Sequence, residues 1–69
     1  MKILVYHRDA ETYGALIRER FPELEVVATK EEALLPQHII DADILIGFRF
    51  PSALFKEAKR LRWIQATGA

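Results

Sequence analysis

Apolar residues fall in four short blocks along the chain, separated by stretches of mixed polarity. The blocks cover residues 3–6, 24–28, 42–48 and 63–66. Short, nearly continuous apolar runs are typical of strands that are buried on both faces of a sheet. Each block is therefore predicted to form a strand, with pairing centred on residues 26–28 in the second block and 44–46 in the third. The pattern of the second block also suits a strand at the edge of a sheet.

The stretch after the first block has the pattern of an amphipathic helix. Asp9 offers an N-cap and Pro22 ends the helix. The residues that recur on one face, and are predicted to be buried, are Ala10, Tyr13, Gly14, Ile17 and Phe21. Glycine lowers helix propensity by about 1 kcal/mol relative to alanine. Gly14 on the inner face therefore predicts that the helix backbone approaches the sheet closely.

The two later connections carry shorter helical patterns. Residues 31–35 predict a helical turn that Pro36 interrupts, followed by a short helical piece over residues 37–41. After the third strand, Pro51 and Ser52 are typical of a helix start. The inner face of that predicted helix carries Leu54, Ala58 and Leu61.

The elements alternate in the order β-α-β-α-β-α-β. Such alternation predicts an α/β fold with a parallel sheet and right-handed crossovers. The expected spatial order is 2-1-3-4, which is that of a parallel flavodoxin-like sheet whose last strand and helix are missing. The fourth strand is then expected to lie at an edge.

Composition narrows the class of protein. A chain of 69 residues is one small domain at most, and 51% hydrophobic residues exclude intrinsic disorder. Ten basic and ten acidic residues argue against nucleic-acid binding, which needs excess positive charge. Residues 33–40 form the longest segment without a charged side chain, so we expect no membrane span or export signal and a cytoplasmic protein. A domain this small buries little surface, which favours an incomplete unit.

The same counts limit the chemistry. The chain has no cysteine, which excludes disulfides, thiolate zinc sites and thiol nucleophiles. Its two histidines, His7 and His38, have no third ligand at metal spacing, so no metal is expected. His38 is expected to face solvent.

Ligands of open parallel sheets bind beyond the carboxyl ends of the strands, which directs attention to residues 7–9, 48–50 and 67–69. His7 is either a general base or phosphoryl acceptor, or a strand-end histidine bonded to neighbouring backbone. Arg49 lies between two phenylalanines and either clamps a carboxylate or phosphate, or packs its stem on an aromatic ring at the surface. Gly68 and Ala69 follow Thr67 in a turn of small residues, where backbone N–H groups could approach an anion.

Other charged residues favour structural interpretations. Asp41 and Asp43 bracket the turn before the third strand and give little support to a paired acid/base site. A cluster of basic residues is expected on the solvated face of the last helix; it comprises Lys56, Lys59, Arg60 and, just beyond, Arg62.

The second half of the chain resembles a known family. The runs ADILIG at 42–47, PSAL at 51–54 and LRWIQATGA at 61–69, together with Arg49, are similar to the N-terminal part of the D-isomer-specific 2-hydroxyacid dehydrogenases, in particular the glyoxylate/hydroxypyruvate reductase-like members. The resemblance implies that residues 1–69 are the N-terminal portion of a flavodoxin-like substrate-binding domain. It also implies that Arg49 faces the substrate and that Gly68 and Ala69 begin the backbone loop holding the substrate carboxylate.

The resemblance further implies a homodimeric parent protein with an inserted Rossmann domain that binds NAD or NADP. The family's catalytic Arg, Glu and His would lie downstream, so no catalytic residue is expected in this chain. The chain has no Gly-rich strand-to-helix turn, so alone it is expected to bind no cofactor and to be inactive. The expected function is therefore that of a fragment supplying one wall of the cleft for a 2-oxo or 2-hydroxy acid. The alternative is a free-standing small flavodoxin-like module that binds a partner or phosphate without catalysis.

Overall fold

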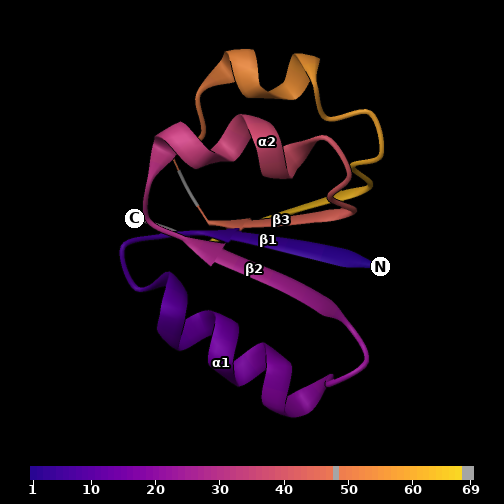
Figure 1. Ribbon diagram of the computed structural model, residues 1–69. Helices are drawn as coiled ribbons and strands as arrows, with labels where there is room; N and C mark the ends of the chain where they lie inside the picture. Colours follow the sequence, from indigo (N-terminus) through magenta and orange to yellow (C-terminus); the bar gives the residue numbers. More distant parts are fainter. Residues whose placement is uncertain (48, 68–69) are drawn as a thin grey trace.

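The computed structural model describes residues 1–47 and 49–67 and has an α/β fold. Its sheet contains β1 (Lys2–Tyr6), β2 (Glu25–Thr29), β3 (Ile44–Gly47) and β4 (Trp63–Ala66). The strand order is β2-β1-β3-β4, and every neighbouring pair is parallel. The predicted fold class and strand order are confirmed, and all strand carboxyl ends lie at one edge of the sheet (Figure 1).

Helical elements cover the two faces of the sheet (Figure 1). Helix α1 (Ala10–Arg20) lies against one face. The opposite face is covered by the 3-10 helix η1 (Glu32–Leu34), helix α2 (Leu35–Ile39) and the 3-10 helix η2 (Ser52–Lys56). A strand placed between two such layers must be apolar on both sides, which explains the continuous apolar runs of β1 and β3.

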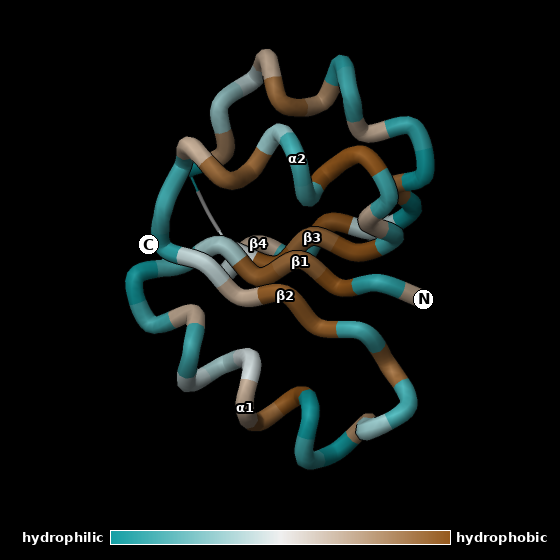
Figure 2. The backbone as a smooth tube through the Cα atoms, viewed as in Figure 1, coloured by the Kyte–Doolittle hydropathy of each residue, from teal (hydrophilic) through white to brown (hydrophobic). Residues whose placement is uncertain are grey.

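Alternating side chains divide the core into two clusters. Leu4 and Leu45 point toward α2 and η2, where they pack with buried residues that include Leu35, Ile39 and Leu54. On the α1 face the buried cluster is Ile3, Val5, Ala10 and Val26. Figure 2 shows the resulting apolar band along β1 and β3. Both clusters meet on β1, so this strand is the centre of the hydrophobic core.

Helix α1 matches its prediction in position and, for three of the five predicted residues, in its buried face. Ala10 and Gly14 are buried and Ile17 packs against the same core cluster, whereas Tyr13 is 37% exposed and Phe21 is 50% exposed. Asp9 makes no side-chain cap; its carbonyl instead accepts hydrogen bonds from the N–H groups of Thr12 and Tyr13. A Cβ at Gly14 would lie 2.9 Å from the Cβ of Ala28, so the predicted close approach of helix and sheet is confirmed.

The later helical predictions need two corrections. Pro36 does not interrupt a helix, because it lies in the first turn of α2. Backbone N–H groups in the first turn form no intrahelical hydrogen bond, so a proline there removes none. The helix predicted after Pro51 is only the 3-10 helix η2. Its inner face is nevertheless used, because Leu54 is buried and Ala58 and Leu61 pack against the same cluster. Isolated short helices are marginal in water, and Leu54 is the one buried residue of η2.

Strand β4 lies at an edge of the sheet, as predicted. All its residues are exposed, and Trp63 retains 61% of its accessible surface. Trp63 pairs with Ile44, so it lies on the α1 face of the sheet, beyond the area that α1 covers. None of the described helices has the length and apolar content needed to cross a bilayer.

Candidate anion-binding site

A pocket of about 270 Å³ lies at the carboxyl edge of the sheet. Its lining consists of Tyr6, His7, Arg8, Lys30 and Arg49. These residues end or directly follow β1, β2 and β3, which are neighbours in the sheet. The pocket therefore occupies the place where open parallel sheets bind their ligands.

Strand register brings the three loops together. Tyr6 is level with Thr29 of β2 on one side and with Gly47 of β3 on the other. The residues that follow each of these positions must therefore leave the sheet at the same height. Neighbouring strands are about 4.8 Å apart, so the three loops are within reach of one small ligand.

The pocket has a positive charge. Arg8, Lys30 and Arg49 each bring one cation, and no Asp or Glu lines the pocket within the described part of the chain. Guanidinium groups bind carboxylates and phosphates through paired hydrogen bonds, and lysine binds them as a point charge. The lining is therefore suited to an anion rather than to a metal ion. Among residues 1–47 and 49–67, no group of three or more potential metal ligands is found.

His7 is held by the start of the following turn. The backbone N–H of Asp9 donates a hydrogen bond to Nδ1 of His7 at 3.0 Å, and Oδ2 of Asp9 lies 3.9 Å from the same nitrogen. The ring also meets Tyr13 edge-on, with centroids 4.9 Å apart. Because Nδ1 accepts a hydrogen bond, the neutral ring carries its proton on Nε2. The backbone-bonded geometry is thus the one present, and it fixes the orientation of the ring at the pocket.

Arg49 has a left-handed backbone with a φ of 62°. Bulky residues rarely adopt this conformation, and such outliers concentrate at functional sites. The chain reaches it through Gly47, whose φ is 147° and whose missing Cβ would collide with the carbonyl oxygen of Tyr6. Phe50 packs its ring 6.2 Å from that of Tyr6. The close passage of β3 beside β1 and the anchored Phe50 together hold Arg49 at the pocket.

The fourth strand adds one polar group to this edge. The N–H of Thr67 donates to the carbonyl oxygen of Gly47 at 3.0 Å. The Oγ1 hydroxyl of Thr67 is buried without a hydrogen-bond partner among the described residues. The predicted substrate-binding residues Gly68 and Ala69, and Phe48 beside Arg49, lie outside the described residues.

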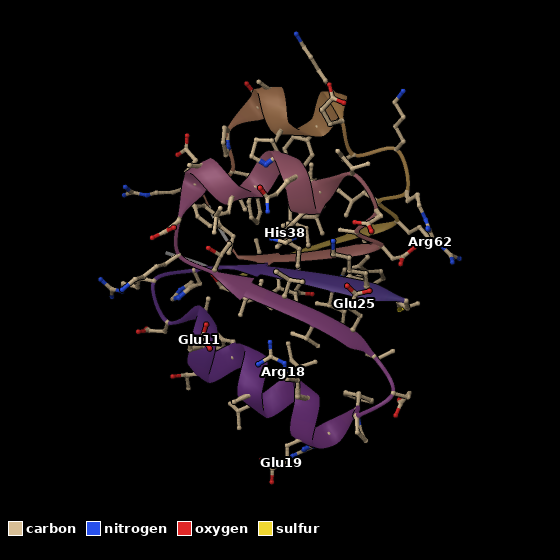
Figure 3. The ribbon with its side chains drawn as sticks, viewed as in Figure 1. Glu11, Arg18, Glu19, Glu25, His38 and Arg62 are labelled. Carbon is tan, nitrogen blue, oxygen red and sulfur yellow. The ribbon has the colours of Figure 1, made fainter. Side chains whose placement is uncertain are left out.

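The remaining charged residues are structural or exposed. The N–H of Lys2 donates to Oδ2 of Asp43 at 2.8 Å, which holds the pKa of that carboxyl below its usual range. The Lys2 ammonium binds Asp41 and lowers its pKa in the same way. Both carboxylates thus secure the start of β1. The predicted basic cluster is exposed, but η2 ends at Lys56, so Lys59 and Arg60 lie beyond the helix that was predicted to carry them. Figure 3 shows Arg62 at the opposite end of the strands from the pocket. His38 is half-buried on α2 rather than fully solvent-facing.

Comparison of the chain with models of known protein families, with curated proteins and with solved structures finds no match. The geometry therefore carries the functional argument. Of the residues that the sequence directs attention to, His7, Arg8 and Arg49 meet in one pocket. Lys30 was missed, although it follows β2 and the rule for strand ends applies to it as well.

Proposed function

We propose that the chain forms one wall of the substrate cleft in an NAD(P)-dependent oxidoreductase that interconverts 2-oxo acids and D-2-hydroxy acids. The cation-lined pocket at the carboxyl edge of the parallel sheet is the observation that carries this proposal. A 2-oxo acid bears a carboxylate beside its carbonyl group, and the guanidinium of Arg49 can donate paired hydrogen bonds to that carboxylate. The resemblance of residues 42–54 and 61–69 to 2-hydroxyacid dehydrogenases supports the same assignment.

The chain's own part in such a reaction is binding and orientation. The nicotinamide cofactor would supply the hydride in the complete enzyme, and a downstream histidine would protonate the carbonyl oxygen. Binding of the carboxylate by Arg49 would orient the substrate for transfer of the hydride and for transfer of the proton. Such orientation supplies a large part of an enzyme's rate enhancement. The strained backbone of Arg49 supports this role, because a left-handed arginine needs surrounding structure to hold it. The exposed Trp63 supports a larger protein in which further chain covers β4.

A second candidate function is a small binding module for phosphate. The same pocket favours it, since Arg8, Lys30 and Arg49 line it from three loops and no carboxylate lines it among the described residues. Phosphate accepts hydrogen bonds on several sides and suits a ring of separate cations. The two functions differ in whether a 2-oxo carboxylate binds specifically.

Titration with oxamate, a stable isostere of a 2-oxo acid, tests the first function. Oxamate should shift the backbone amide NMR signals of residues that follow β1, β2 and β3. Arg49→Gly is the sharpest variant, because glycine adopts a φ of 62° without strain and the fold should persist. Loss of a charge-assisted bond predicts an affinity lower by about 10-fold or more.

Arg62→Ala is the matched control, since it removes an exposed arginine from the other end of the sheet. It should leave oxamate binding unchanged. If oxamate produces no shifts, or binds Arg49→Gly as tightly as the parent chain, the substrate-wall function is wrong. Binding of inorganic phosphate without binding of oxamate would favour the phosphate module.

A further inference from the structure

The backbone positions that carry the cations of the pocket are spread across three strand ends of the sheet. Arg8 follows β1, Lys30 follows β2 and Arg49 follows β3. Strand β1 lies between the other two, so β2 and β3 are separated by two strand spacings, which is about 10 Å. A single carboxylate is much smaller than this span. When one is bound at the β3 end, it leaves the β2 end of the pocket unused.

The charge is also larger than one carboxylate requires. One guanidinium can bind a carboxylate through two parallel hydrogen bonds. Neither Arg8 nor Lys30 forms a salt bridge with another described residue, and neither is balanced by an acid lining the pocket in residues 1–47 and 49–67. Keeping like charges together at a site is unfavourable until an anion binds. Two cations therefore remain for a second anionic group on the same ligand.

We propose that the substrate is a 2-oxo acid carrying a second anionic group, a carboxylate or a phosphate, at its other end. Arg49 binds the carboxylate beside the carbonyl, and Arg8 and Lys30 bind the distal group. Tyr6, which ends β1, and His7, which follows it, lie between the β2 and β3 ends of the pocket. This inference rests on the proposed function, since it assigns the class of substrate to the same site.

Three matched ligands test the inference on the 69-residue chain by isothermal titration at low salt. Oxamate carries one charge, N-oxalylglycine adds a carboxylate to the same core, and N-(phosphonomethyl)oxamate adds a phosphonate in its place. At least one of the two larger ligands should bind about 10-fold more tightly than oxamate, and the tighter one identifies the distal group. The advantage should shrink as salt is raised, because the cations are exposed.

Variants then locate the distal group. Lys30→Met should remove most of the gain of the larger ligands, so it should lower their affinity several-fold more than it lowers the affinity for oxamate. Lys56→Met removes an exposed lysine of η2 and should affect none of the three. Equal affinity for all three ligands, or a gain that survives Lys30→Met, overturns this inference but leaves the proposed function standing. Failure of all three to bind removes the proposed function and the inference together.

Discussion

Replacement of Gly47 by alanine tests how the end of β3 positions the pocket. Gly47 is level with Tyr6 in the parallel pairing of β1 and β3. A Cβ at this position would overlap the carbonyl oxygen of Tyr6, which belongs to the backbone of the central strand and cannot turn aside. The φ of 147° is a second obstacle, because side chains are rarely found at this angle.

The two effects add to a large fraction of the stability of this chain. A residue forced into a conformation suited to glycine costs about 1–3 kcal/mol. Overpacking against backbone costs about 1–3 kcal/mol more. The expected loss is thus about 2–6 kcal/mol, while stability of about 0.05–0.15 kcal/mol per residue gives a 69-residue chain only about 3–10 kcal/mol in total. Gly47→Ala should therefore leave the protein partly or wholly unfolded.

Urea unfolding followed by circular dichroism measures this effect. A chain of this length is accessible to chemical synthesis, so D-alanine can be placed at position 47 as a second variant. D-alanine satisfies the positive φ and directs its Cβ away from the position that an L-residue would occupy, so it should destabilise less than L-alanine. If Gly47→Ala unfolds within about 0.5 kcal/mol of the parent chain, the close passage of β3 beside β1 is wrong.

Two further predictions concern the opposite face and end of the sheet. Gly14→Ala gains about 1 kcal/mol of helix propensity but forces its Cβ against that of Ala28, so it should lower the free energy of unfolding by about 0–2 kcal/mol. Adding Ala28→Gly should recover part of this loss. An increase in the free energy of unfolding by the full propensity gain would contradict the contact between Gly14 and Ala28. The pKa values of Asp41 and Asp43 are lower in the folded chain than in the unfolded one, so their contribution to stability is present above the unfolded pKa of about 3.9 and is lost as pH falls through the folded values. Urea midpoints measured between pH 6 and pH 2 should show this fall, and Asp43→Asn should reduce it; an equal fall in the variant would assign the acid sensitivity elsewhere.

The apolar pattern predicted the sheet well because its two central strands, β1 and β3, are short and are covered on both faces. The block at residues 63–66 was predicted as a strand, and β4 has these bounds, although all four residues are exposed. Helical spacing was less informative. It placed Tyr13 on the buried face of α1, but the ring of Tyr13 instead meets His7 outside the core. The spacing of apolar residues predicts which of them share one face of a helix. It does not predict how much of that face the sheet covers.

The site was only partly predictable for a related reason. Arg49 attracts attention because it follows a buried strand, and this needs only the chain order of the elements. Its left-handed backbone comes two residues after Gly47, which passes close to Tyr6, and that passage is a contact between residues far apart in sequence. Lys30 follows a strand whose end has no unusual sequence. It lines the pocket because β2 lies next to β1 and β1 lies next to β3 in the sheet, and this order brings the three strand ends together.

Steady-state oxidation of NADH and NADPH by the product of the complete reading frame encoding this chain is the decisive test of whether the pocket serves a 2-oxo acid reductase. With glyoxylate, hydroxypyruvate or a 2-oxo acid bearing a second anionic group as substrate, the product should oxidise at least one cofactor above a no-enzyme control. Arg49→Ala should raise the KM for the 2-oxo acid by about 10- to 150-fold, the equivalent of losing a direct bond to the carboxylate. Absence of turnover with every substrate and both cofactors, or turnover that Arg49→Ala leaves unchanged, would contradict the assignment of this pocket to a 2-oxo acid.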